Sequence, residues 1–381
     1  MKTKRKTNNR QNKTRKNNNK HMPIIIPNLT PPDVQNVSSI IYKNYDKPNI
    51  ISSYSPTINR ELVPLESIPR QHISDCNNDL AFELKEPLKI GIPGKLYGKN
   101  CVPYYEPKAI KQLLKNLSAN KHVQIDKIVP PIQSQSNCWF NTMFVALFIS
   151  DKGRKFFHFF RQLMITGQQA NGELIPTNLR NAFALLNYAI DASLVGNKYA
   201  YILDTNTIIK NIYENIPTDY KKLNPYLTNV DEAGNPIRYY ISLISYLNNK
   251  SIKLVLIKDT DDKWKDKIVK TIGSNVPHII ILELYDEKSK VVTNKPRSFS
   301  VNGIRYALDS CIIRDTSKQH FSALLTCEKK ELAYDGMSFH RLVKMDWKHL
   351  LNSDISWSFE GIKLQWNFKH GYQMLIYYRV R

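Results

Sequence analysis

The chain has 381 residues, five of them cysteines, and a formal net charge of +22. This length allows one large domain or two small ones with a substantial core. No two cysteines form a CxxC pair, which argues against a structural zinc site and against a disulfide framework. No apolar run approaches the roughly 20 residues of a membrane-spanning helix. The odd cysteine count and the lack of a secretory signal predict a reducing, intracellular setting, with no metal, cofactor or membrane partner.

The positive charge is concentrated at the start of the chain. Residues 1–20 contain nine Lys and Arg and no acidic residue, and removing those nine charges leaves +13. A block of like charges among Asn and Thr has nothing apolar to bury, which predicts a disordered tail over residues 1–22. Such a tail could direct nuclear import, contact nucleic acid by counterion release, or only keep the protein soluble.

Composition divides the rest of the chain into a linker and a globular domain. Residues 23–84 alternate short apolar pieces with prolines, which predicts an extended linker that can dock one strand onto the body. Residues 85–381 have a globular composition and are expected to form one domain.

The predicted elements of this domain begin with helices and end with strands. Apolar residues recur on one face of Pro107–Leu117, with the proline at the first helical position, and segments 181–194 and 237–247 are also helical in pattern. From residue 252 the pattern changes to short strands, predicted at 252–257, 277–285, 304–313, 321–327 and 372–378. Helices followed by strands predict an α+β fold with the helices segregated from an antiparallel sheet.

The most informative motif is Gln133–Thr142, a polar loop that delivers Cys138 to the start of a buried predicted helix. Unpaired N–H groups and the positive end of the helix dipole favour a thiolate, which is the nucleophilic form of cysteine. Cys138 is therefore a candidate nucleophile if a histidine and an orienting group follow in suitable contexts.

Among the nine histidines, His320 is the best candidate for a general base. It ends the polar loop 314–319 and begins a predicted strand, which would hold its side chain rigidly. By contrast, His158 lies within an aromatic run and His278 opens an apolar strand, so both are expected to be packing residues.

Asp335 follows His320 by fifteen residues, after a charged turn. A hairpin of that length returns the chain beside its start, so Asp335 is expected to approach His320 and fix its tautomer. Cys138, His320 and Asp335 would then serve as nucleophile, base and orienting group. The alternative is three residues that never meet.

Together these motifs resemble the ubiquitin-specific proteases, the papain-like deubiquitinating cysteine proteases. The segments that carry the likeness are Asn137–Thr142, Gly234–Ile244, Val276–Leu284, Tyr306–Leu308, Gln319–Ala323, Tyr334–Gly336 and Gly371–Arg379. The likeness covers residues 130–381, and the cysteine and histidine boxes are specific in combination. A composition rich in Lys, Asn, Ile and Tyr is typical of AT-rich genomes. It suggests a divergent member from a large DNA virus, located in the host cytoplasm, the nucleus or the virion.

The resemblance implies a papain-like fold with a helical lobe and an antiparallel sheet lobe, and a site made of Cys138, His320 and Asp335. It also implies that Gln133, five residues before the nucleophile, donates to the oxyanion together with the Cys138 backbone N–H. The family usually has Asn at that position, and Gln135 is the fallback donor. The implied substrate is ubiquitin or a ubiquitin-like modifier, cleaved after its C-terminus.

The chain departs from the family in three places. Gln319 replaces the usual glycine before the histidine, and apolar or basic residues around Arg238 replace the acid that grips the substrate tail. The zinc-bearing fingers insertion is absent. Ubiquitin's tail is basic, so local acid would be needed near the cleft. The acidic residues that could supply it are Asp231, Glu232, Glu283 and Asp286.

Three alternatives remain open. Transglutaminase-like enzymes share the order of the three residues, but usually with much less than the 182 residues between Cys138 and His320. A protease that processes viral or structural proteins would use the same chemistry on another substrate. A catalytically inactive papain-like scaffold, with a basic tail that binds nucleic acid, would keep the fold without a reactive cysteine.

Overall fold

The computed structural model describes ten stretches of the chain: residues 49–51, 73, 75–93, 100–230, 232–247, 253–259, 263–274, 276–285, 294–338 and 341–380. The tail expected over residues 1–22 and most of the linker expected over 23–84 therefore lie outside the described residues.

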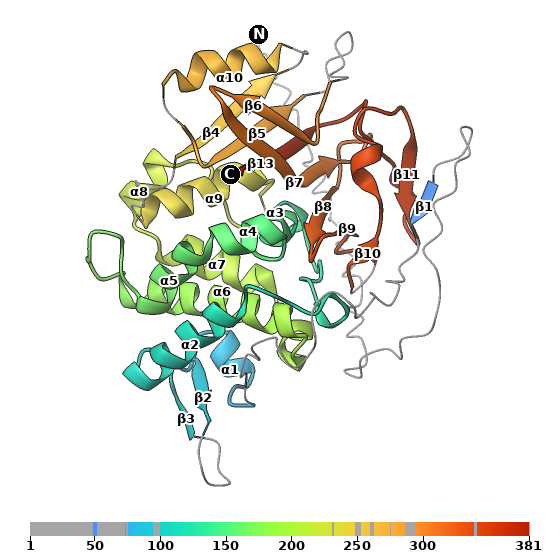
Figure 1. Cartoon of the computed structure of the whole chain (residues 1–381). Coiled ribbons are helices and arrows are strands. Elements are labelled where there is room, and N and C mark those ends of the chain that lie inside the picture. Colours follow the sequence, from blue (N-terminus) through green and yellow to red (C-terminus); the bar gives the residue numbers. More distant parts are fainter. Residues whose placement is uncertain are drawn as a thin grey trace, which may run out of the picture.

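Helices dominate the first part of the described chain and strands the second (Figure 1). The α-helices are α1 (Asp79–Phe82), α2 (Pro107–Ala119), α3 (Cys138–Phe148), α4 (Asp151–Phe156), α5 (His158–Thr166), α6 (Thr177–Val195), α7 (Thr205–Asn215), α8 (Thr218–Leu223), α9 (Pro236–Tyr246) and α10 (Trp264–Ile272). The 3-10 helices are η3 (Ile125–Lys127), η4 (Lys198–Tyr201) and η5 (Trp347–His349). The strands are β1 (Asn49–Ile51), β2 (Lys89–Ile92), β3 (Asn100–Pro103), β4 (Leu254–Asp259), β5 (Ile279–Leu284), β6 (Ser298–Val301), β7 (Ile304–Arg314), β8 (Phe321–Cys327), β9 (Lys330–Tyr334), β10 (Val343–Lys344), β11 (Ser356–Phe359), β12 (Trp366–Asn367) and β13 (Gln373–Val380).

The main sheet has the strand order β10-β9-β8-β7-β13-β5-β4, and β6 pairs with β7. Its pairings are antiparallel except for β4 with β5, which are parallel and joined through α10. The fold is therefore α+β with a mostly antiparallel sheet, and the strands predicted at 304–313, 321–327 and 372–378 are confirmed as β7, β8 and β13.

Side chains alternate between the two faces of this sheet and form two cores. Met374 and Ile376 of β13 join the core beneath the helices, whereas Leu375 and Tyr377 join a second core on the other face. The second core is closed by α10, η5, β11 and β12. The segregation of helices from the sheet has one exception, because α10 lies on the face away from the other helices. Trp264, Ile268 and Ile272 are buried at a helical spacing and hold α10 there.

The cysteines were expected to form no disulfide framework, and the structure contains one disulfide among the described residues. Cys76 and Cys101 are joined, which ties the segment before α1 to β3 across 25 residues. Ala81 and Phe82 of α1 are buried, so residues 75–84, at the end of the expected linker, pack onto the helical body. Further back in the chain, β1 pairs in parallel with β11.

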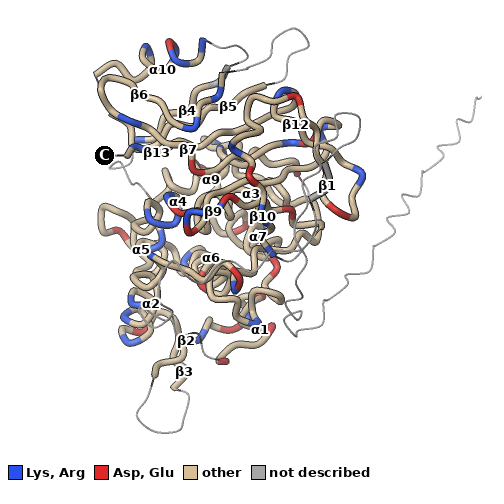
Figure 2. The backbone as a smooth tube through the Cα atoms, turned by 45° about the vertical axis from the view of Figure 1, so that its right-hand side comes forward, with Lys and Arg blue, Asp and Glu red and all other residues tan. Residues whose placement is uncertain are grey.

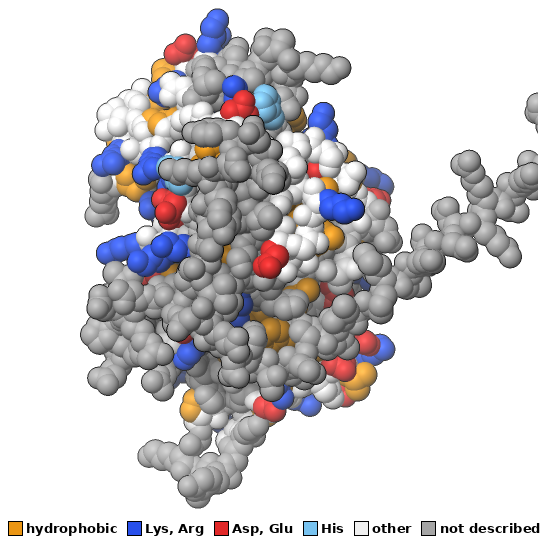
Figure 3. Space-filling view, turned by 90° about the vertical axis from the view of Figure 1, so that its right-hand side faces the viewer, with side chains coloured by type: hydrophobic (Ala, Val, Ile, Leu, Met, Phe, Trp, Pro, Cys, Tyr) orange, Lys and Arg blue, Asp and Glu red, His pale blue; other side chains and the backbone are white. Residues whose placement is uncertain are grey.

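Charged residues are unevenly spread over the described surface. Figure 2 shows Lys and Arg along α2 and around α4 and β9. In the space-filling view of Figure 3, several Lys and Arg side chains lie together along the left edge, with a histidine and an acidic side chain beside them. No helix in the described part of the chain is both long and apolar enough to cross a membrane.

Candidate active site

Cys138 is the first residue of α3, where the helix enters the body between the helical layer and the sheet (Figure 1). The following residues of α3 are all buried, whereas Cys138 is partly exposed. The N-cap residue Asn137 makes no side-chain cap to the helix, and its Nδ2 donates to Thr205 Oγ1 at 2.9 Å instead. The first N–H groups of α3 thus receive no side-chain cap and can donate to a ligand.

The loop before Cys138 is fixed to the end of β9, directly before and after the predicted acid Asp335. Tyr334 Oη donates to the Pro131 carbonyl at 2.7 Å, and Gln133 N–H donates to the Gly336 carbonyl at 3.0 Å. A Cβ on Gly336 would lie 3.1 Å from Gln133 Cβ and 2.7 Å from Tyr334 Oη, so this approach requires glycine. The loop therefore places Gln133 beside Gly336, the residue after Asp335.

His320 ends the turn between β7 and β8 and is 3% exposed. The turn is organised by Asp315, a fully buried carboxylate that accepts N–H bonds from His320 at 2.5 Å, Gln319 at 2.7 Å and Ser317 at 2.9 Å. The His320 carbonyl in turn accepts from Asp315 N–H at 2.9 Å. Sequence reasoning missed Asp315, although an Asp followed by Thr-Ser is typical of a turn in which the carboxylate binds nearby backbone N–H groups.

The structure places Cys138, His320 and Asp335 next to one another. His320 Nε2 lies 2.6 Å from Asp335 Oδ1, and Cys138 lies close enough to the imidazole to raise its pKa. Burial acts to lower the pKa of His320, but the hydrogen bonds and negative charge of Asp335 and Cys138 outweigh burial and raise that pKa to about 9.

Asp335 is fully buried and has two further hydrogen-bond partners. Met337 N–H donates to Oδ1 at 3.1 Å, and the Ser338 hydroxyl donates to Oδ2. These bonds fix the carboxylate while leaving Oδ1 in contact with His320. Ser338 carries no sequence pattern that would have identified it.

Two tryptophans flank the reactive groups. The Trp366 ring lies edge-on to the His320 ring, with centroids 6.0 Å apart, and is fully buried. Trp139 follows Cys138 and packs so closely on Gly234 that a Cβ there would lie 2.3 Å from the indole. The imidazole and the start of α3 are thus held by apolar packing as well as by hydrogen bonds.

The predicted oxyanion donor Gln133 is engaged elsewhere. Its Nε2 donates to the Gln135 carbonyl at 2.9 Å, and its buried Oε1 has no partner among the described residues. Gln135, the fallback donor, is exposed. Its carbonyl holds the Gln133 amide, so the two glutamines form one local unit beside the nucleophile.

Of the four acids considered for gripping a basic substrate tail, Glu283 is fully buried. Tyr285 Oη donates to it at 2.8 Å, Tyr372 Oη also donates to it, and Arg238 lies 3.8 Å away. The carboxylate of Glu283 is thus committed to neighbours within the protein. Glu232 is exposed, and Asp231 and Asp286 lie outside the described residues.

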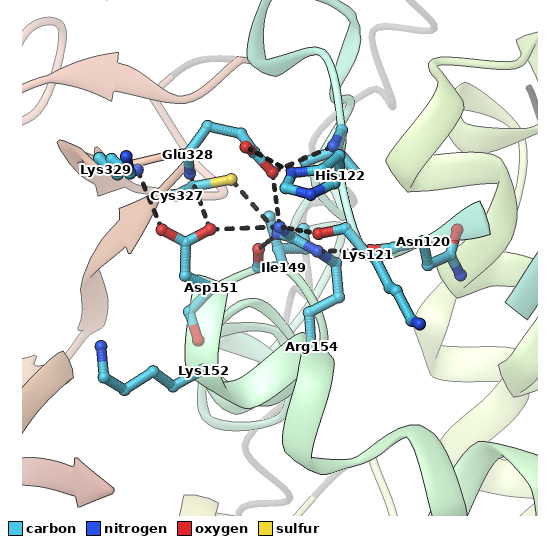
Figure 4. A network of polar contacts seen from close by, with 12 residues as sticks. Asn120, Lys121, His122, Ile149, Asp151, Lys152, Arg154, Cys327, Glu328 and Lys329 are labelled. Atoms are coloured by element: carbon cyan, nitrogen blue, oxygen red, sulfur yellow. Dashed lines mark hydrogen bonds and ion pairs between the residues drawn. The ribbon is translucent and has the colours of Figure 1, made fainter. Parts of the chain in front are cut away.

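The other free cysteines differ sharply from Cys138. Cys311 and Cys327 are fully buried, and burial raises the pKa of each thiol to about 12. Cys327 lies within a polar network around Arg154, whose guanidinium donates to its sulfur at 3.5 Å (Figure 4). Over the described ranges, no cluster of three or more His, Cys, Asp or Glu is arranged to hold a metal ion.

A scan against protein-family models and a search of curated proteins both give no match. Among solved structures, the chain is similar to the SAGA DUB module containing Ubp8 in complex with monoubiquitin, at 9% identity and a TM-score of 0.43, with 68% of this chain and 70% of that chain covered. The same module bound to ubiquitin aldehyde gives 10% identity and a TM-score of 0.42, with 68% and 70% covered. An essential yeast splicing factor gives 9% identity and a TM-score of 0.39, with 67% and 70% covered.

Proposed function

We propose that this protein is a cysteine-type peptidase with Cys138 as nucleophile, His320 as general base and acid, and Asp335 as the residue that orients His320. The observation that carries this proposal is the 2.6 Å contact between His320 Nε2 and Asp335 Oδ1, with Cys138 close enough to the same imidazole to raise its pKa. Nε2 faces Asp335, so Nδ1 is the nitrogen left to exchange a proton with the thiol.

The proposed reaction is acyl transfer in two steps. His320 holds the Cys138 proton, the sulfur attacks the scissile carbonyl carbon, and the carbonyl π electrons move onto oxygen. The tetrahedral intermediate collapses when the C–N bond breaks and His320 gives its proton to the leaving amine. Water, deprotonated by His320, then cleaves the thioester and releases a carboxylate and the free thiol.

Two donors are proposed for the oxyanion. The Cys138 backbone N–H belongs to the uncapped first turn of α3. The Gln133 amide is close in the chain, but it must leave the Gln135 carbonyl before it can donate to substrate. Each donor of this kind typically contributes about 100- to 1000-fold to the rate.

The proposed substrate is the C-terminal tail of ubiquitin or of a ubiquitin-like modifier. This proposal is supported by the resemblance of the cysteine and histidine boxes to those of ubiquitin-specific proteases. Glu283 is buried and committed within the protein, so a basic tail would have to be held by other groups, among which Glu232 is exposed.

A ubiquitin probe with a C-terminal electrophile tests both the proposed peptidase chemistry and the proposed ubiquitin substrate. We expect a covalent adduct with the wild-type chain and none with Cys138→Ala. In parallel, alkylation by iodoacetamide should modify Cys138 far faster than the buried Cys311 and Cys327. Rapid alkylation without an adduct would reject the ubiquitin substrate only. Slow alkylation of Cys138, at the rate of an ordinary exposed thiol, would reject the peptidase itself.

A further inference from the structure

A second candidate site lies at the opposite end of β9 from Asp335. A surface pocket of about 470 Å³ is lined by Arg297, Lys329, Lys330, Glu331, Lys344, Asp346 and His349. Glu331 precedes Asp335 by four residues, which is about 13 Å along a strand. The pocket is therefore separate from the cysteine site.

Positive charge exceeds negative charge in the lining of this pocket, where four Lys and Arg residues lie with two acidic ones. Within the described ranges, no acidic group pairs with the side chains of Arg297, Lys329, Lys330 or Lys344, although the structure forms ion pairs elsewhere. One of the two acids in the lining, Glu331, already accepts the Lys348 backbone N–H at 2.9 Å. The lining thus has a surplus of uncompensated positive charge, which a bound anion would neutralise.

A further lysine, Lys348, adjoins the pocket lining through its contact with Glu331. Its Nζ donates to Thr326 Oγ1 at 2.6 Å. Burial lowers the pKa of Lys348, Glu331 and Asp309 oppose that effect, and the charges of Lys152 and Arg297 add smaller lowering contributions. Further cations therefore lie close to the pocket lining.

The wall of the pocket is held rigidly. Asp151 accepts the N–H groups of Glu328 at 2.8 Å and Lys329 at 3.0 Å, so it fixes the turn between β8 and β9. Arg154 donates to Glu328 at 2.7 Å from below, and Figure 4 shows Lys152 and Lys329 on the same side of this network. The turn therefore presents Lys329 from a fixed backbone.

We propose that this pocket binds phosphate groups of a nucleic-acid backbone. Its cations come from four segments, which are the segment before β6, the β8–β9 turn, β9 and β10, so positive charge is available from several sides of the pocket. That arrangement suits a chain of spaced phosphates, and the +13 charge outside residues 1–20 favours a long polyanion through counterion release. This binding does not depend on the proposed peptidase activity.

The test compares two charge reversals of equal size in the full chain. One variant combines Lys330→Glu and Lys344→Glu in the pocket, and the matched control combines Lys111→Glu and Lys115→Glu on the exposed face of α2. Binding of a fluorescent 20-nucleotide oligomer is measured by anisotropy over a range of salt concentrations. The pocket variant should bind about tenfold more weakly near physiological salt, and its salt slope should fall by about 1 to 2. The control should bind within about twofold of wild type, because residues 1–20 contribute equally to all three proteins.

Equal losses in the two variants would overturn the proposal, because they would reflect total charge alone. A loss in neither variant would also overturn it. Two competitors, inorganic phosphate and poly-glutamate, show which kind of anion the pocket binds. Each is compared with unlabelled oligomer at the same total concentration of negative charge. Displacement by the oligomer at far lower concentration than by either competitor supports a nucleic-acid site. Displacement by poly-glutamate or free phosphate at the same concentration rejects it. Urea unfolding midpoints close to wild type would establish that both variants are folded.

Discussion

At the scale of a single residue, the protonation of His320 depends on two neighbours that oppose burial. Asp335 and Cys138 raise the pKa of the imidazole to about 9, so at neutral pH the folded chain holds His320 protonated. Because this pKa lies above the ordinary value near 6.5, the interactions stabilise the fold fully below about pH 6.5. That contribution is lost as the pH rises through about 9.

The pH dependence of activity should follow His320. We expect kcat/KM for a fluorogenic ubiquitin substrate to fall above about pH 9, because the leaving amine then lacks its acid. In Asp335→Asn the alkaline limb of the pH profile of kcat/KM should move toward or below the ordinary histidine pKa near 6.5. The value of kcat/KM should also fall by about 10²- to 10⁴-fold. An Asp335→Asn variant with an unmoved alkaline limb would show that His320 is not the titrating acid.

At the scale of one element, the β7–β8 turn is built around a carboxylate that does not touch the reacting groups. Asp315 is a positioning residue, because it holds the backbone N–H groups of Ser317, Gln319 and His320. The Thr316 N–H donates to the Gln365 carbonyl at 2.8 Å, which joins the turn to the chain before β12. The direction of the His320 side chain therefore follows from the shape of this turn.

Replacing Asp315 by Asn should disturb the turn without removing a reacting group. In the variant, the amide nitrogen would face backbone N–H groups that donate to a carboxylate oxygen in the wild-type chain, and those hydrogen bonds would be lost. We therefore expect kcat to fall by about 10²-fold with a small change in KM. Ser317→Ala is the control, because it removes one hydroxyl bond and leaves the three N–H bonds to Asp315. If Asp315→Asn retained the wild-type kcat, the turn would not determine the position of His320.

At the scale of the whole molecule, the helical layer and the sheet are joined by a polar network around Arg154 (Figure 4). Arg154 of α4 donates to the carbonyls of Asn120 at 2.7 Å and Ile149 at 2.6 Å, and it pairs with Glu328 at 2.7 Å and Asp151 at 3.2 Å. The network thus links the segment after α2, the start of α4 and the β8–β9 turn. Each of these segments borders a different part of the fold.

Arg154→Met should destabilise the chain by about 3 kcal/mol, because buried carbonyls and carboxylates lose their shared donor. The measurement is urea unfolding followed by tryptophan fluorescence. A thiol reagent provides a local readout, since Cys327 contacts the guanidinium and should react sooner in the variant. Lys155→Met, an exposed change on the same helix, should alter neither quantity. An equally small effect of both substitutions would mean that the network contributes little to stability.

The sequence allowed the strands and the meeting of His320 with Asp335 to be predicted, because both follow from local rules. Strand periodicity identified β7, β8 and β13, and hairpin length returned Asp335 beside the start of β8. Which ring nitrogen faces Asp335, and how far the pKa of His320 is raised, required the structure. The position of Gln133 near Gly336 could not be predicted from residue spacing either, because it depends on a contact between segments far apart in the sequence.

The features that could not be predicted from the sequence depend on contacts between residues that show no characteristic sequence pattern. Asp315 binds backbone N–H groups, which every residue other than proline carries, so nothing in the sequence marks its targets. Cys76 and Cys101 lie 25 residues apart with no characteristic spacing. Helix α10 was missed because only its three buried residues follow a helical period within a charged segment.

The position of β13 in the middle of the sheet has a consequence for biosynthesis. Its neighbours β5 and β7 emerge from the ribosome first, and about 60 residues separate the end of β7 from the start of β13. At about 5–20 residues per second, this interval lasts roughly 3 to 12 s. During it, β5 and β7 expose unpaired edges that can bind other nascent chains. The halves of the sheet are therefore most exposed to aggregation while the ribosome is still translating, and a chaperone that covers apolar strands would act in that interval.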